Sequence, residues 1–202
     1  MNELLTKENL DYQERAREVA EKYVRPVAAE LDRTGEYGWE ILEALKSYGL
    51  TGVWIPKEYG GQDAGVLNLC LIVEQLSRAC GGVGVAFAVN ALGSFPIILG
   101  GTEEQKQKYL TRLATGEWIG SYCLTEPEAG SDAGNQKTRA ELKGDHYVLN
   151  GTKMFVTNGG AADLYLVYAR TDPEAKTRGI TAFLVEEAFP GVERGHREKT
   201  MG

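Results

Sequence analysis

Two short stretches of the 202-residue chain carry the side chains best suited to bind a ligand. The first, from Tyr122 to Asp132, has the sequence YCLTEPEAGSD, and the second, from Lys153 to Gly160, has the sequence KMFVTNGG. Hydroxyl-bearing and small residues therefore recur where strands are expected to end. This pattern suits a flat, partly polar ligand that carries a phosphate group.

Each residue type in these stretches has a chemical use. Phe155 offers the face of an aromatic ring, and the hydroxyls of Thr125 and Thr157 can donate or accept hydrogen bonds. Gly130 and Ser131 allow backbone N–H groups to approach an anion closely. A pair of β-turns that binds nothing would have the same spacing, so the spacing alone leaves both interpretations open.

The acidic residues of the first stretch, Glu126 and Asp132, are not predicted to be catalysts. Carboxylates at a turn after a strand usually hold the loop through hydrogen bonds to backbone N–H groups. Cys123 lies within an apolar segment, where a lone cysteine serves more often for packing than as a nucleophile.

The two stretches together resemble the paired signatures of the acyl-CoA dehydrogenase family of flavoproteins. The resemblance extends over nearly the whole chain and is strongest toward the short-chain, butyryl-CoA type of bacterial members. A further run near residue 56 is also similar to the family, although we favour its interpretation as a structural turn. The residues that carry the resemblance are Cys123-Leu124-Thr125-Glu126-x-x-Ala129-Gly130-Ser131-Asp132, Lys153-x-Phe155-x-Thr157-Asn158-Gly159 and Pro56-x-x-Tyr59-Gly60-Gly61.

The resemblance implies that the chain binds FAD. Thr125 and Thr157 would form hydrogen bonds near the reactive edge of the isoalloxazine, Phe155 would pack on its face, and Ser131 would lie between the FAD pyrophosphate and the CoA substrate. Phe155 stands where many members have Trp, and Asn135 where most have a small residue. The implied cofactor-binding residues are Tyr122, Cys123, Leu124, Thr125, Gly130, Ser131, Phe155, Val156 and Thr157, and the implied substrate-binding residues are Ser131, Asn90 and Ser94.

The family reaction is the α,β-desaturation of an acyl-CoA thioester, in which a carboxylate removes the α proton and the β hydride passes to flavin N5. The electrons then pass to an electron-transfer flavoprotein. The catalytic glutamate of the family lies in a C-terminal helical domain that this chain does not reach, so no catalytic residue is assigned here. The full-length form is expected to be a homo-oligomer, a tetramer.

Two other functions stay open at this stage. The same scaffold could pass its electrons to oxygen, as acyl-CoA oxidases do. It could also belong to a non-catalytic binding or interaction protein that keeps the fold without the chemistry.

Charge and composition limit the classes of partner. A net charge of −7 argues against a nucleic-acid partner, which needs a basic surface. The three cysteines and two histidines lack the spacing of a metal site. No secretory signal, transit peptide or membrane-spanning segment is predicted. We therefore expect the cytoplasm, or the mitochondrial matrix in a eukaryote.

The periodicity predicts an α+β protein in two parts. An all-α helical domain should occupy residues 1–117, and a β domain, resembling a partial β-barrel or β-sandwich and incomplete at its C-terminal end, should occupy residues 118–202. Helix caps are expected at Thr6, Gly49 and Thr102. The helix over residues 83–99 is apolar on all sides, which predicts burial.

The β domain is predicted from short segments rich in β-branched and aromatic residues. Asn150-Gly151 is typical of a hairpin turn between two of them. The expected strands are Ile119 to Leu124, Lys137 to Leu142, His146 to Leu149, Thr152 to Thr157, Leu164 to Arg170 and Ile180 to Glu186.

Overall fold

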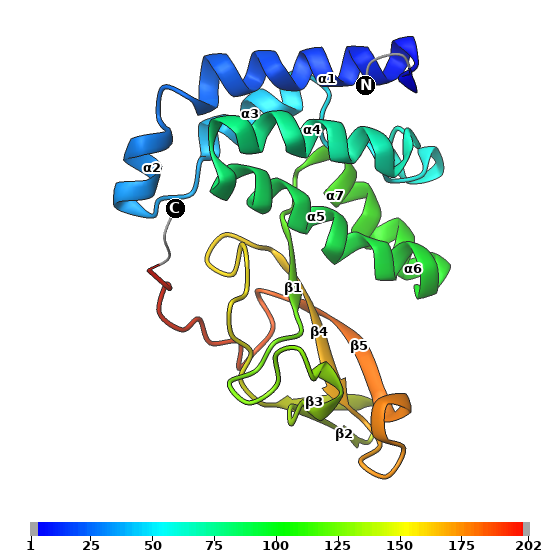
Figure 1. Ribbon diagram of the computed structural model, residues 1–202. Coiled ribbons are helices and arrows are strands. Elements are labelled where there is room, and N and C mark those ends of the chain that lie inside the picture. The colour runs from blue at the N-terminus through cyan, green and yellow to red at the C-terminus, as the bar shows by residue number, and fades with distance from the viewer. Residues whose placement is uncertain (1–3, 200–202) are drawn as a thin grey trace. The chain divides into compact units, whose positions relative to one another are not determined.

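The structure is a computed structural model that describes residues 4–199 (Figure 1). The described residues divide into two compact units. One contains the chain up to Ile119 together with Lys199, and the other contains Gly120–Glu198. The first is helical and the second is built on a β-sheet, which confirms the α+β class.

The helical unit contains long helices joined by short links. Thr6 accepts a hydrogen bond from the backbone N–H of Asn9, and Thr102 accepts one from Gln105, so the helix caps predicted at Thr6 and Thr102 are confirmed. Gly49 has the left-handed φ of 61° expected after a helix end. The helical elements are α1 (Lys7–Val19), the π-helix η2 (Ala20–Val24), α2 (Ala28–Thr34), α3 (Trp39–Ser47), α4 (Gly65–Ala79), α5 (Gly81–Gly100), α6 (Glu103–Gln105), the π-helix η4 (Lys106–Leu110) and α7 (Thr111–Thr115).

The core of this unit lies where α1, α4 and α5 pack side by side (Figure 1). Val19, Ile72 and Leu76 are fully buried there. Between α1 and α4, the buried side-chain amide of Asn9 donates a 2.7 Å hydrogen bond to Asn68. Apolar burial and one satisfied polar contact therefore fix the register of the two helices.

The run from Pro56 to Gly61 has a structural role in this unit. It includes the short 3₁₀ helix η3 (Lys57–Tyr59). A Cβ atom added at Gly61 would lie 2.0 Å from the carbonyl oxygen of Ile55, so the chain can pass there only with glycine. The interpretation of this run as a structural turn agrees with that close approach.

Helix α5 corrects two expectations about the helix over residues 83–99. It begins two residues earlier than expected, at Gly81. The expected burial on all sides is wrong, because Val85, Leu92 and Leu99 are 53%, 47% and 85% exposed. These residues are spaced by seven and lie on one face, while the opposite face packs on the unit.

The expectation that no segment is long and apolar enough to span a membrane is also wrong. Among the described residues, α5 qualifies by length and composition, with 20 residues and a mean hydropathy of 1.8. Core helices of water-soluble proteins pass the same test, so α5 is weak evidence of a membrane contact.

The β unit is a five-stranded mixed sheet centred on β4. Strand β4 pairs in parallel with β1, with Tyr122 opposite Leu166, and antiparallel with β5, with Leu166 opposite Leu184. Strands β2 and β3 form an antiparallel hairpin, and β2 joins β4 at the pair Arg139 and Arg170. Among the described residues the sheet is open and not closed into a barrel. The strands are β1 (Gly120–Cys123), β2 (Arg139–Lys143), β3 (His146–Asn150), β4 (Leu164–Arg170) and β5 (Ile180–Glu186), with short 3₁₀ helices at η5 (Ala133–Asn135) and η6 (Lys176–Gly179).

Two predictions for this unit are wrong. The segment 152–157 is not a strand, because Phe155 has a φ of 54°, outside the β region. Asn150-Gly151 does not form a hairpin turn; the β2–β3 turn is at Gly144 and Asp145. Glycine is needed at 151 for another reason, since a Cβ atom there would lie 2.3 Å from the hydroxyl oxygen of Thr138.

Candidate functional site

The first of the two stretches begins on β1 and continues into a tight turn. Tyr122 is half-buried and Cys123 is buried. Burial raises the pKa of the Cys123 thiol to about 11, so the thiol is neutral near pH 7 and packs in the core as the sequence predicted. Beyond β1, Glu126 and Ala129 exchange two backbone hydrogen bonds of 3.0 and 3.2 Å. This turn leaves Gly130 and the residue after it exposed.

The second stretch lies alongside the first and runs in the opposite direction. At one end, the backbone N–H of Met154 donates a 2.9 Å hydrogen bond to the carbonyl of Thr125. At the other end, the hydroxyl of Ser121 donates to the carbonyl of Thr157 at 2.6 Å, and the side-chain amide of Asn158 donates to the carbonyl of Gly120 at 3.2 Å. Two of these three hydrogen bonds between the segments therefore come from side chains, whereas two paired strands would be joined by their backbones.

Phe155 and Asn158 have left-handed backbone conformations, with φ of 54° and 64°. A bulky residue with positive φ is a backbone outlier that the surrounding structure must hold in place. Phe155 is also 63% exposed, so its ring is free to contact a ligand on at least one side. Thr125 and Thr157, one in each stretch, are half-buried.

A buried ion pair connects the two stretches. The ammonium of Lys153 lies 2.8 Å from the carboxylate of Glu126, and the two side chains are 9% and 6% exposed. Lys153 donates two further hydrogen bonds, to the carbonyl of Leu124 at 3.0 Å and to the side-chain oxygen of Gln136 at 2.8 Å. All three ammonium hydrogens therefore have acceptors.

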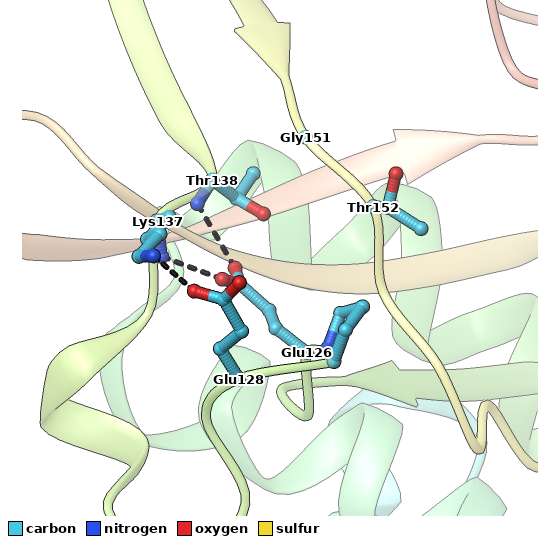
Figure 2. Close-up of a pocket in the computed structure, with 7 residues that line it drawn as sticks. Glu126, Glu128, Lys137, Thr138, Gly151 and Thr152 are labelled. Atoms are coloured by element: carbon cyan, nitrogen blue, oxygen red, sulfur yellow. Dashed lines mark hydrogen bonds and ion pairs between the residues drawn. The ribbon is translucent and has the colours of Figure 1, made fainter.

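Glu126 accepts hydrogen bonds from the backbone as well. The N–H groups of Lys137 and Thr138 donate to its carboxylate at 2.5 and 3.0 Å, as Figure 2 shows. Burial alone would raise the pKa of Glu126, but the N–H of Lys137, the Lys153 ammonium and the Thr138 contacts outweigh it and hold this pKa at about 2. The prediction that Glu126 holds the loop through backbone hydrogen bonds is confirmed.

The buried environment acts in the opposite sense on the lysine. Burial lowers the pKa of Lys153, and the neighbouring Glu126 carboxylate offsets part of that effect. The Glu126 carboxylate is ionised near neutral pH, since its pKa of about 2 is well below 7.

A pocket of about 210 Å³ lies beside Glu126 in the β unit (Figure 2). Thr138 lines the pocket, and its hydroxyl is buried. The side-chain amide nitrogen of Gln136 is also buried. Neither atom has a hydrogen-bond partner within residues 4–199. The predicted site residues do not line the pocket. Its lining residues are Glu126, Pro127, Glu128, Lys137, Thr138, Gly151 and Thr152.

Asn90 and Ser94 belong to the helical unit. Ser94 is fully buried, where its hydroxyl accepts a 2.7 Å hydrogen bond from the indole of Trp54 and donates to the carbonyl of Ala91. The side-chain amide of Asn90 donates to the carbonyls of Ala86 and Phe87. Among residues 4–199, no group of three or more His, Cys, Asp or Glu side chains is placed to hold a metal.

Family models match both parts of the chain. The model described as "Acyl-CoA dehydrogenase, N-terminal domain" matches residues 6–117, and the model described as "Acyl-CoA dehydrogenase, middle domain" matches residues 121–202. The chain belongs to the acyl-CoA dehydrogenase family. The resemblance predicted from the two stretches is confirmed.

Members of the acyl-CoA dehydrogenase family with established names are similar to the chain over almost all of its length. The short-chain specific acyl-CoA dehydrogenase of Clostridium acetobutylicum is 47% identical over 199 residues, which are 98% of this chain and 52% of that protein. The chain spans about half the length of the curated relatives that it matches.

Solved structures are similar in fold as well as sequence. A chain in the structure of the electron transferring flavoprotein of Acidaminococcus fermentans matches with a TM-score of 0.94 at 42% identity, covering 100% of this chain and 53% of that one. An acyl-CoA dehydrogenase from Bacillus anthracis, complexed with FAD, matches with a TM-score of 0.90 at 38% identity, covering 99% of this chain and 34% of that one.

In this acyl-CoA dehydrogenase family member, sequence reasoning gave no role to Lys153, Gln136 or Ser121, which connect the two stretches. Lys153 stood within the motif without an assigned function. The feature of the sequence that could have indicated this role is a lysine flanked by apolar and small residues. A second feature is Glu126 in the preceding turn, which the structure shows to be buried.

Proposed function

We propose that the β unit of this chain contributes to the FAD site of an acyl-CoA dehydrogenase that acts on short acyl-CoA thioesters. The observation that carries the proposal is the alignment of two stretches, distant in sequence, beside a ring at Phe155 that is 63% exposed. A flavin requires an apolar surface together with a few fixed polar groups, and these residues offer both.

The residues present fit FAD at three kinds of position. Phe155 offers a ring face for the isoalloxazine, while the hydroxyls of Thr125 and Thr157 offer hydrogen bonds along its edge. Gly130 and Ser131 are exposed, and their backbone N–H groups would bind the pyrophosphate. The remaining proposed cofactor contacts are Tyr122, Cys123, Leu124 and Val156.

For the substrate, we assign Ser131 to the CoA moiety, and Asn90 and Ser94 to the acyl chain. The hydroxyl of Ser94 is already occupied by Trp54 and Ala91. Ser94 would therefore act through its small size, by leaving room for the thioester tail.

When bound, FAD supplies the acceptor for the hydride that leaves the β carbon of the thioester. The chain's own contribution is to bind and orient. Glu126 is unsuited to remove the α proton, because its carboxylate accepts three hydrogen bonds and its pKa is about 2. The base would come from a part of the longer protein that this chain does not contain.

The electron acceptor is proposed from the similarity to a solved structure. An electron-transfer flavoprotein is proposed as the partner, since a chain with a TM-score of 0.94 occurs in the structure of such a protein from Acidaminococcus fermentans.

The first test is a visible absorption spectrum of the purified chain, with and without added FAD. A perturbed flavin band that Phe155→Ala weakens would support the assigned site. The decisive assay uses the protein extended past Gly202 with butyryl-CoA and an electron acceptor. The proposal is wrong if that extended protein purifies without flavin and desaturates no acyl-CoA.

A further inference from the structure

The buried pair of Glu126 and Lys153 lies at the junction of the two candidate flavin-binding stretches. Glu126 belongs to the first stretch and Lys153 begins the second, 27 residues later. The ammonium reaches back to Leu124, next to Thr125, whose carbonyl accepts the N–H of Met154. The side chain of Lys153 thus connects Leu124, Glu126 and Gln136, which lie close in sequence to the proposed cofactor contact Thr125 or beyond it.

The backbone just beyond Lys153 is strained. Phe155 holds a φ of 54°, which a bulky side chain adopts only where neighbouring contacts enforce it. The contacts before it come from Lys153 and Met154, and those after it from Ser121 to Thr157 and from Asn158 to Gly120. The segment is therefore anchored on both sides of the residue in the unfavourable conformation.

We propose that Lys153 and Glu126 are positioning residues that fix the backbone at Phe155, so that its ring is presented to the flavin. The flavin in this statement rests on the proposed function. The fixed backbone does not, because it concerns only this chain.

The geometry at Lys153 suits an ammonium group. Three acceptors, on Leu124, Glu126 and Gln136, lie 2.8 to 3.0 Å from one nitrogen. The planar fork of an arginine cannot direct its hydrogens to three acceptors gathered around one point. Lys153→Arg keeps the positive charge but should still disturb the alignment of the second stretch with the first.

A positioning role differs from a contribution to stability alone. Removing one member of a buried ion pair leaves the other charge without a partner, whereas replacing both members restores much of the lost stability. A double variant, Glu126→Gln with Lys153→Met, should therefore regain stability but not the alignment of the second stretch.

The experiment compares wild type, Lys153→Met, Lys153→Arg and the double variant in the full 202-residue chain. The control is Lys137→Met, which removes an exposed lysine paired with the exposed Glu128. Three quantities are measured: the midpoint of thermal unfolding, the exchange rate of the Met154 amide hydrogen, and the dissociation constant for FAD.

We expect Lys153→Met and the double variant to exchange the Met154 amide at least tenfold faster than wild type and to bind FAD at least tenfold more weakly. The double variant should unfold closer to wild type than the single variant, and Lys137→Met should match wild type throughout. Lys153→Arg should fold and show faster Met154 exchange, which keeps the test decisive if Lys153→Met does not fold.

Two results would overturn the proposal. One is a double variant whose FAD affinity and Met154 exchange return to wild-type values together with its stability. The other is unchanged Met154 exchange in a folded Lys153→Arg or Lys153→Met chain. If the wild-type chain and its extended form bind no FAD, the proposed function fails, and the exchange rates still decide whether the pair fixes this backbone.

Discussion

The hydroxyl of Ser121, just before the first stretch, donates a 2.6 Å hydrogen bond to the backbone carbonyl of Thr157 in the second stretch. Ser121 is fully buried on β1. A side chain in the core of the sheet thereby sets the position of a proposed flavin contact.

Ser121→Ala should lower both stability and FAD affinity. Removing the hydroxyl leaves the Thr157 carbonyl without this donor, which costs about 1–3 kcal/mol in the free energy of unfolding. Chemical denaturation and a flavin titration measure the two effects. Ser131→Ala is the matched control, since Ser131 is exposed: it should weaken FAD binding and leave stability unchanged. Equal stability of Ser121→Ala and wild type would contradict the role of this hydrogen bond.

Gly151→Ala should destabilise the β unit, because the added Cβ would lie 2.3 Å from the hydroxyl oxygen and 2.7 Å from the Cα of Thr138. Overpacking of this kind costs about 1–3 kcal/mol. Gly130→Ala is the control: a Cβ there meets no described atom within 4 Å, so stability should hold. The same control should weaken FAD binding if the backbone of Gly130 approaches the pyrophosphate. Thermal unfolding and a flavin titration distinguish the two variants.

Glu126 should make the stability of the chain depend on pH in the acid range. Its carboxyl takes up a proton near pH 4.5 in the unfolded chain and at about pH 2 in the folded one. The stabilisation is therefore complete above about pH 4.5 and is lost as the pH falls toward 2. It amounts to about 3 kcal/mol. The measurement is the free energy of unfolding of wild type and Glu126→Gln from pH 2 to 7. Parallel pH profiles for the two proteins would rule out this carboxyl as the source.

Phe155→Gly should separate strain from ligand binding. Glycine adopts a φ of 54° without steric cost, so relief of strain should stabilise the chain by about 1 kcal/mol. The loss of the ring should weaken FAD binding, whereas Phe155→Trp should retain it. Lys176→Gly, at an exposed residue outside both stretches with a φ of 53°, relieves strain without removing a ring and serves as the control. Tighter FAD binding by Phe155→Gly would show that the ring is not a contact.

Local rules predicted the parts of the fold that depend on neighbouring residues. The helix caps at Thr6 and Thr102 and the strands Leu164–Arg170 and Ile180–Glu186 follow from sequence within a few positions. The family was also recognisable, because the types and spacing of the motif residues are specific to it.

The failures share a physical cause. Thr152 to Thr157 has the composition of a strand, but bonds from Ser121 and to Leu124 and Glu126 impose another path. The sequence of these six residues alone cannot indicate partners that lie about thirty residues away. The same is true of Gly151, whose need for glycine comes from Thr138 and not from a turn.

The parallel pairing of β1 with β4 has a consequence for the order of folding. The β2–β3 hairpin closes through a two-residue turn and can form within microseconds. Strand β1 has no such local partner, because Gly120 pairs with Leu164. Closing that long loop costs chain entropy before any contact rewards it. During synthesis β1, which leads into the first stretch, can therefore join the sheet only after β4 has left the ribosome, so this part of the sheet is completed late in the life of the nascent chain.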